Sequence, residues 1–359
     1  MLEVTLRRYL ADDDRVADVR RIVDGGAWSP DLWEGLCEFG LFWTVVPEDL
    51  GGTGRGLLDL AVAAECLGAF AAPGPFLEHA LATLAVALGG DDDQRARLLP
   101  DLASGRRRAT IAVAEPGECW RADALAMGGP TLSGQKSWVL HGRGADVMVV
   151  VLHDGLAVVD GAASGVNIQP IDGLDRTRRF ASVRFADPDH ERLGGGAVVA
   201  ERVLDAASVL LAADAFGGAQ RCLNAAVEYA KNRKQFGVTI GHFQAIKHQL
   251  ADLALEIEPC RGLYWYAAHA FDHVPADAAR FASLAKAHIT ERYVTGMRRI
   301  IEVHGGIGYT WECDLHVYLR RAVFDRAYGG DPSLHRERFA VLSGWGADGV
   351  SGLPVDRPA

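Results

Sequence analysis

The chain has 359 residues, of which 49% are hydrophobic and 23% are charged, and its formal net charge is −10. This length and composition predict a folded protein of two or three domains rather than a disordered chain. The acidic balance excludes nucleic acid as the main partner, because phosphate binding needs a surplus of Lys and Arg.

Cysteine spacing and hydropathy exclude further classes of protein. The six cysteines are scattered and form no CxxC pair, so the spacing of a metal site is absent and a reducing compartment is expected. No hydrophobic run reaches the roughly 18 residues of a membrane helix. The opening sequence MLEVTLRRYLADDD lacks the apolar core of a signal peptide. We therefore expect a cytoplasmic protein with no metal ion and no membrane partner.

Residues 1–108 predict an N-terminal helical domain. Apolar side chains recur at three- and four-residue steps in residues 14–23, 30–39 and 57–71, which is the period of an amphipathic helix. The pattern changes after this region. Residues 109–196 contain short runs such as ATIAVAEP and DVMVVVL, and FASVRFA alternates between apolar and polar side chains. These runs predict a middle β domain.

Residues 197–345 return to helical periodicity and predict a C-terminal four-helix-bundle domain. Apolar residues from Phe243 to Tyr264 follow one helical stripe, and residues 201–231 and 280–304 behave similarly. The last segment, 346–359, is rich in Gly and Pro and is expected to be a tail. The predicted fold class is therefore α+β, with the order helical domain, β domain, helical bundle.

The first stretch that could carry chemistry is NRKQFGVTIGHFQAIKHQLAD, which starts at Asn232 and follows a long predicted helix. Arg233 could pair with a phosphate through its planar guanidinium group. Phe236 could pack on a ring, and Gln244 could hydrogen-bond a diphosphate. Periodicity alone favours a simpler interpretation, an ordinary loop between two helices.

The second stretch is IIEVHGGIGYTWE, in which Gly305 and Gly306 follow a predicted helix. Paired glycines permit a close approach of the backbone to a cofactor. The same pattern is also typical of a helix C-terminus without any ligand. Neither stretch by itself decides between a binding site and a structural role.

Together the two stretches resemble the acyl-CoA dehydrogenase family. The matches are RKQFG followed by HFQAIKHQLAD, and HGGIGYTWE, with weaker matches in AEPGE and KSWVLHG. The domain order agrees, so the resemblance covers nearly the whole chain. It implies a flavoprotein in which FAD carries the redox chemistry. In this family a carboxylate removes the α-proton of a CoA thioester, and the β-hydrogen passes to the flavin as hydride.

The resemblance also implies which residues bind the cofactor. In this family the C-terminal domain reaches into the FAD site of a neighbouring subunit. Arg233, Phe236 and Gln244 match the positions that contact the neighbour's FAD, and Gly305 and Gly306 match the segment beside it. Glu302 stands where the family usually has Gln near the diphosphate, and a carboxylate at that place repels phosphate. Asp205 matches the family pattern near the substrate.

The sequence departs from the family where the chemistry is expected. Gly329 occupies the place of the usual catalytic Glu. Ala207, 26 residues before Arg233, occupies the place of the base in another branch of the family. Leu140 and Ala114 replace two residues that hydrogen-bond the flavin ring. The side chains that would hydrogen-bond the flavin ring and the side chain that would act as the base are lost. The side chains that would contact a neighbour's FAD are mostly retained.

We therefore expect a subunit of a hetero-oligomer, with a heterotetramer as the expected assembly. It would be catalytically incomplete and would complete the FAD site of a second acyl-CoA dehydrogenase-like subunit. The partners implied are an acyl-CoA substrate and an electron-accepting flavoprotein. Several such family members act on thioesters of bulky ring systems, such as steroid side chains.

Two alternatives stay open from the sequence. The first is a self-sufficient homo-oligomeric dehydrogenase or oxidase with a displaced base. Asp331 is the weak candidate for that base, although it could instead cap the helix that begins near Pro332. Asp214 and Asp325 are further candidates. The second alternative is a flavin-free structural paralogue.

Overall fold

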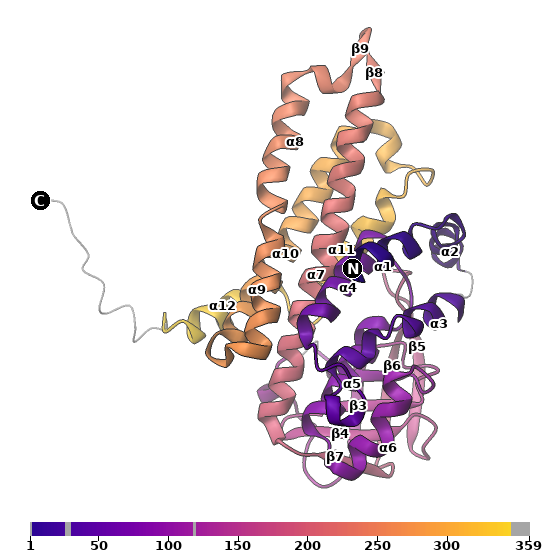
Figure 1. The fold of residues 1–359 in the computed structure, drawn as a ribbon, viewed down its shortest axis with the longest axis vertical. Helices are drawn as coiled ribbons and strands as arrows, with labels where there is room; N and C mark the ends of the chain where they lie inside the picture. The colour runs from indigo at the N-terminus through magenta and orange to yellow at the C-terminus, as the bar shows by residue number, and fades with distance from the viewer. Residues whose placement is uncertain (1, 26–29, 118–119, 346–359) are drawn as a thin grey trace, which may run out of the picture.

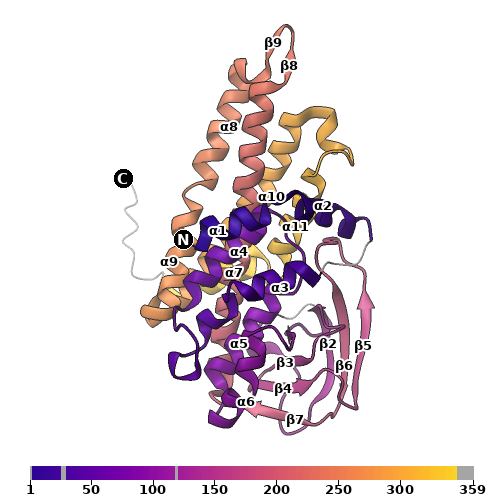
Figure 2. The ribbon, with the colours of Figure 1, turned by 45° about the vertical axis from the view of Figure 1, so that its right-hand side comes forward.

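The structure is a computed structural model that describes residues 2–25, 30–117 and 120–345. Short helices and two small sheets occupy one end, and long helices run from them to a hairpin at the opposite end (Figure 1). The turned view shows the sheets stacked beside the N-terminal helices (Figure 2). The predicted α+β fold, with a helical domain, a β domain and a helical bundle in that order, is confirmed. The predicted tail, 346–359, lies outside the described residues.

The N-terminal region is helical, as its periodicity predicts. Helix α6 begins with a capping box, in which the Asp91 side chain accepts the backbone N–H of Gln94 and the Gln94 side chain accepts that of Asp91. The helices of this region are α1 (Leu2–Leu10), α2 (Asp13–Val23), α3 (Pro30–Glu38), α4 (Leu57–Ala69), α5 (Phe76–Gly89) and α6 (Asp92–Ala103).

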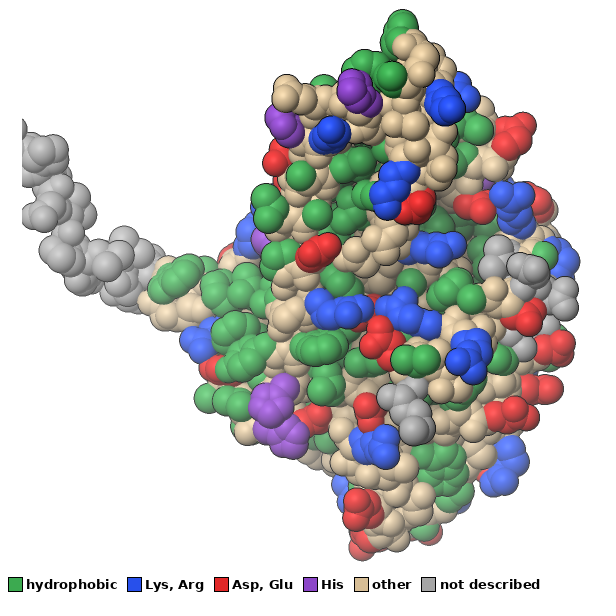
Figure 3. Space-filling view, turned by 45° about the horizontal axis from the view of Figure 1, so that its top comes forward, with side chains coloured by type: hydrophobic (Ala, Val, Ile, Leu, Met, Phe, Trp, Pro, Cys, Tyr) green, Lys and Arg blue, Asp and Glu red, His purple; other side chains and the backbone are tan. Residues whose placement is uncertain are grey.

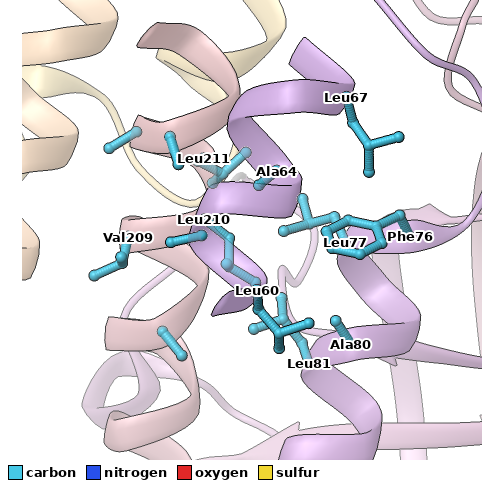
Figure 4. Packing of buried hydrophobic residues seen from close by; sticks show 14 of the residues in the cluster. Leu60, Ala64, Leu67, Phe76, Leu77, Ala80, Leu81, Val209, Leu210 and Leu211 are labelled. Carbon is cyan, nitrogen blue, oxygen red and sulfur yellow. The ribbon is translucent and has the colours of Figure 1, made fainter. Parts of the chain in front are cut away.

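Helices α4 and α5 pack against α7 (Gly196–Asn232), the longest helix. Figure 4 shows Leu60 and Leu77 lying between these helices, with Leu210 and Leu211 on α7. The approach of α4 to α7 requires glycine, because a Cβ at Gly68 would lie 2.0 Å from the backbone oxygen of Asp214. This contact joins the N-terminal and C-terminal helical regions in one core.

The middle region forms two sheets that enclose a small apolar core of their own. In the first sheet β1 runs parallel to β3, and the other pairs are antiparallel. Its order is β1 (Ala109–Ala112), β3 (Val147–Leu152), β4 (Gly155–Asp160) and β7 (His190–Leu193). The second sheet is antiparallel, in the order β2 (Ser133–Leu140), β6 (Phe180–Ala186) and β5 (Val166–Ile171).

Strand β2 carries an irregularity that positions an aromatic side chain. Its register with β6 shifts between Lys136 and Val139, and Trp138 within the shift has φ +57°. Such a bulge re-aims the side chain that it carries. Lys136 is fully buried beside it and forms an ion pair with Glu115 at 3.0 Å. Trp138 consequently packs against Phe180 and lines a pocket described below.

The C-terminal region consists of long helices around α7. The predicted stripe from Phe243 to Tyr264 proves to be two helices, because the chain bends at Glu258 and Pro259 between them. A short hairpin, β8 (Lys234–Gln235) and β9 (Val238–Thr239), precedes the first of them. The remaining helices are α8 (Gln244–Ile257), α9 (Cys260–His273), α10 (Pro275–His304), α11 (Leu315–Ala327) and α12 (Pro332–Leu342).

The element type changes between Ala103 and Ala109, and again between Leu193 and Gly196. The domain boundaries at 108/109, 196/197 and 345/346 stay predictions, since an element boundary does not establish an independently folding unit. None of the described helices has both the length and the hydropathy that crossing a membrane would require.

Candidate functional site

A pocket of about 370 Å³ lies where α7, α12, the β domain and the turn after α11 meet. Its walls are mostly apolar, and its charged groups come from α7, α12 and the segment after Trp120. We call it the acyl pocket. The lining residues used below are Trp120, Glu201, Ala207, Tyr328, Gly329, His335 and Arg338.

The two positions at which the sequence predicts a lost base lie in this one pocket. Ala207 comes from the middle of α7, and Gly329 comes from the turn between α11 and α12, yet both line the same walls. Neither residue has a side-chain atom that can accept a proton. The structure therefore brings together the two departures that the sequence shows separately.

The backbone at Gly329 is itself suited to glycine. Its φ is +75°, a left-handed conformation that other residues adopt only with strain. A Cβ built there would lie 3.3 Å from a Leu211 side-chain carbon, tighter than an ordinary contact. A glutamate at this position would need a different backbone or would strain this one.

The turn that carries Gly329 is held by side chains from two other helices. The buried ammonium of Lys286 donates to the carbonyl oxygens of Asp325 at 2.7 Å and Gly330 at 3.0 Å, and also to that of Arg326. On the other side, the His335 ring donates from Nε2 to the Gly329 oxygen at 3.0 Å. Burial lowers the pKa of Lys286 to about 7 and that of His335 to about 3. The turn is thus fixed although it carries no base.

Asp331, the candidate displaced base, caps a helix. Its carboxylate accepts the backbone N–H groups of Ser333 and Leu334, both at 2.9 Å, at the start of α12. These hydrogen bonds, first that of Leu334, lower the pKa of Asp331. The side chain is exposed and does not line the acyl pocket. Its capping role is therefore present, and its role as a base stays an untested prediction.

The other two candidate bases are carboxylates buried in a charge cluster. Asp214 accepts from Arg321 at 2.9 Å and from Arg178 at 3.5 Å, which occupies it in ion pairs. Asp325 is fully buried, and burial raises its pKa well above the usual range. Neither residue lines the acyl pocket.

Asp205, which matches the family pattern near the substrate, holds an arginine in place, and its contact with substrate stays a prediction. It is buried on α7 and accepts from Arg338, which also donates to Ser283 at 3.0 Å and to Glu201 at 3.1 Å. Burial raises the pKa of both Asp205 and Glu201. Arg338 and Glu201 line the pocket, whereas Asp205 stands behind them. The sequence reasoning missed Arg338 and Glu201, because nothing in HRERF or AERVL distinguishes them from surface charges.

A second pocket, of about 240 Å³, lies on the β-domain side of α11. Five aromatic side chains line it, and we call it the aromatic pocket: Trp120, Trp138, Phe180, Phe324 and Tyr328. Asp172 and Asp175 are its charged lining residues, and no Lys or Arg is among the described residues that line it. The positions predicted to lack flavin contacts, Leu140 and Ala114, are both fully buried and line neither pocket.

At the far end of the molecule the predicted cofactor residues project from the bundle. The β8–β9 hairpin turns through Phe236 and Gly237, both with positive φ. Phe236 has φ +54° and is 92% exposed, and its ring meets that of Phe243 edge to face at 6.3 Å. Such exposure of a large aromatic side chain, with a strained backbone, is unfavourable. Arg233 and Gln244, on either side of the hairpin, are exposed as well. We call residues 231–248 the arm.

The second predicted cofactor segment lies beside the base of the arm. Tyr229, near the end of α7, stacks on His304 at the end of α10 with ring centroids 4.5 Å apart. Gly305 and Gly306 follow His304, and both are exposed with no atom within 4 Å of a Cβ built there. Glu302 is also exposed. Figure 3, with this end toward the viewer, shows Lys and Arg side chains among hydrophobic ones on this face.

No group of three or more His, Cys, Asp or Glu side chains that could hold a metal ion occurs within residues 2–25, 30–117 and 120–345.

Comparison with known proteins places the chain among flavoenzymes. Family models match residues 1–106 as "Acyl-CoA dehydrogenase, N-terminal domain" and residues 194–341 as "Acyl-CoA dehydrogenase, C-terminal domain". The chain is 35% identical over 324 residues to acyl-CoA dehydrogenase IpdE2 of Mycobacterium tuberculosis, covering 90% of each protein. It is 25% identical over 371 residues to the caffeyl-CoA reductase-Etf complex subunit CarC of Acetobacterium woodii, covering 94% and 96%. A solved structure named "Tcur3481-Tcur3483 steroid ACAD G363A variant" is 30% identical, with a TM-score of 0.85 and 97% of each chain covered.

Proposed function

Because the chain belongs to the acyl-CoA dehydrogenase family of FAD-dependent oxidoreductases, we propose that it is the non-catalytic subunit of a heteromeric member. In this proposal a second, similar subunit carries the base and the flavin ring. The present chain contributes the arm that contacts that subunit's FAD. The assembly oxidises the acyl chain of a CoA thioester at its α and β carbons.

One observation carries the proposal: both family positions for the base, Ala207 and Gly329, line the same pocket and neither can accept a proton. The left-handed backbone at Gly329 supports it further, because the turn is built for glycine rather than for a side chain. If the base had only moved from one family position to the other, position 207 or position 329 would hold Asp or Glu.

The residues fit FAD at the arm but not in the β domain. Arg233 offers a planar cation that would hold a diphosphate, Gln244 offers an amide, and Gly305 and Gly306 leave open backbone beside them. Phe236 would cover an apolar face of the ligand. When bound, FAD supplies the acceptor for hydride.

By contrast, the β-domain side offers little to hold FAD. The aromatic pocket has carboxylates and no cation among its described lining residues, and Leu140 and Ala114 offer no polar side chain.

The proposed division of roles between two subunits also suggests the partners of the chain. The steroid dehydrogenase structure named above joins two gene products in its name, and this supports a hetero-oligomer and a substrate with a bulky ring system. The CarC relative is named as a subunit of an Etf complex, which supports an electron-accepting flavoprotein as the oxidant. The proposed assembly is a heterotetramer of two copies of each subunit.

The test is the flavin content of the purified protein. We expect the chain expressed alone to be colourless and inactive, and the chain co-expressed with a second acyl-CoA dehydrogenase-like protein from a neighbouring gene to carry FAD. A yellow homo-oligomer that oxidises acyl-CoA would contradict the proposal. Absence of flavin in both preparations would instead support a flavin-free structural paralogue.

A self-sufficient homo-oligomeric dehydrogenase or oxidase is the second candidate, and Glu201 favours it. This carboxylate lines the acyl pocket, and burial, with the adjoining Asp205, raises its pKa. An accessible carboxyl with a raised pKa is the kind of group that acts as a general base. Its hydrogen bond with Arg338 counts against this role, because that contact occupies one of its oxygens.

A further inference from the structure

We propose that Trp120 and Tyr328 form a partition that separates the acyl pocket from the aromatic pocket, and that Trp120 is the residue that determines whether this chain can hold an aromatic ring against an acyl ligand. The inference rests on the proposed function and deepens it. It gives a reason, beyond the lost base, why this subunit's own pocket does not turn over substrate.

The two pockets have Trp120 and Tyr328 as common lining residues. Their rings meet edge to face, with centroids 4.6 Å apart and an interplanar angle of 61°. Edge-to-face contact at this distance is a favourable arrangement for aromatic pairs. Because both side chains line both pockets, we place the wall between the pockets at this contact.

Tyr328 is held from behind, and Trp120 is the more exposed of the two. The Tyr328 ring, directly after the end of α11, lies 5.0 Å from that of Phe324 in the last turn of that helix, and its side chain is buried. Trp120 is half-buried and comes from the segment before Ala122. Tyr328 is therefore a fixed part of the wall, and Trp120 is the part that a substitution can remove with the least effect on the core.

The wall between the pockets matters because hydrogen transfer requires contact between the acyl chain and the ring that accepts the hydrogen. A hydrogen passes between an acyl carbon and a ring only when the reacting atoms lie about 3–3.5 Å apart. An acyl group in one pocket and a ring in the other would have the indole and the phenol between them. Removal of the indole would join cavities of about 370 Å³ and 240 Å³.

The aromatic pocket defines the class of ligand that would test this. Five aromatic rings favour a flat aromatic ligand. Asp175 is paired with Arg321 at 3.3 Å, and no Lys or Arg is among the described lining residues, so the pocket offers a phosphate no cation. The probe should therefore be a flavin without phosphate, and riboflavin meets that condition.

The experiment titrates riboflavin with the full chain expressed alone and follows the quenching of riboflavin fluorescence. Trp120→Ala leaves four of the five rings and joins the two cavities, whereas in the unchanged chain the ligand is confined to a pocket of about 240 Å³, so we expect the variant to bind riboflavin at least tenfold more tightly. Tyr328→Phe retains the ring, so it should bind as the unchanged chain does. Equal affinity of Trp120→Ala and the unchanged chain would overturn the partition, and so would tight binding by the unchanged chain.

Two further measurements keep the outcome interpretable. Circular dichroism and a thermal melt show whether Trp120→Ala folds, and Trp120→Leu replaces it if it does not. The bound FAD of the unchanged chain is measured before any titration, because FAD in the lone chain would contradict the proposed function. In the co-expressed complex Trp120→Ala should leave FAD per partner subunit unchanged, so that failure of the partition and failure of the subunit assignment give different results.

Discussion

The arm and the acyl pocket lie in one chain but differ in their exposure to solvent and in the chemical groups that they present. The arm presents Arg233, Phe236 and Gln244 to solvent, and Phe236 keeps an unfavourable backbone and an exposed ring. The acyl pocket is lined mostly by apolar side chains, Ala207 and Gly329 stand where the sequence predicts a base to be lost, and Glu201 is hydrogen-bonded to Arg338. An exposed, strained group is unstable unless a partner covers it. This difference is what the proposed division of roles requires, in which the chain acts on a neighbour's ligand rather than on its own.

The largest effect is expected at the arm. Arg233→Ala would remove the proposed charge-assisted hydrogen bond to phosphate, worth about 1.5–3 kcal/mol, so FAD affinity of the assembled complex should fall about 10- to 150-fold. Equilibrium dialysis or apoprotein reconstitution measures this affinity. Lys234→Ala is the matched control, because it removes one exposed positive charge from the adjacent residue. Equal losses in both variants would mean that net charge, rather than the Arg233 contact, holds the cofactor.

A stability effect of about 2 kcal/mol is expected from His335 below neutral pH. Its folded-state pKa is depressed to about 3 by burial, against 6.5 for the free side chain. The neutral form is favoured in the folded state, so its contribution is present above pH 6.5 and is lost as pH falls toward 3. Between pH 6.5 and pH 5 the loss is about 2 kcal/mol.

Urea unfolding of the unchanged chain and of His335→Gln across this pH range measures that loss. The glutamine can still donate to the Gly329 carbonyl but does not titrate. The difference between the two proteins should shrink or reverse as pH falls. A difference that stays constant with pH would show that His335 does not titrate as its burial predicts.

A smaller effect is expected at Asp331. Asp331→Ala removes the N-cap of α12 and should lower the free energy of unfolding by about 1 kcal/mol. Asp331→Asn keeps an accepting oxygen and should lose less. Turnover of the assembled complex should be unchanged in both variants. A loss of several orders of magnitude with the fold intact would identify Asp331 as a base after all.

No effect on turnover is expected at Glu201. Glu201→Gln keeps the size of the side chain, and the proposed subunit uses a base from its partner. Steady-state turnover of the complex measures this directly, with Glu337→Gln as a control from the same pocket. A fall of about 100-fold or more would support Glu201 as the displaced base and the second candidate function.

Several elements of the fold and of the site could be predicted from sequence because they depend on local pattern. The amphipathic periods gave helices at Pro30–Glu38 and Leu57–Ala69 close to the expected ranges. The stripe that ends at Tyr264 was expected to be continuous, and Pro259 divides it. The identity of Gly329 was enough to predict that this position carries no carboxylate. Arg338 and Glu201 could not be found in this way, since their place in the pocket depends on how α12 packs against α7.

The order of domains, the family, and the absence of a carboxylate at Gly329 and Ala207 were determined by the sequence alone, because each depends on residue identity and short-range spacing. Only the tertiary structure decided that Ala207 and Gly329 share one pocket, and that Trp120 meets Tyr328 across its wall. The physical reason is distance along the chain: contacts between residues more than a hundred positions apart are set by how whole helices and sheets pack, and no local pattern records that packing.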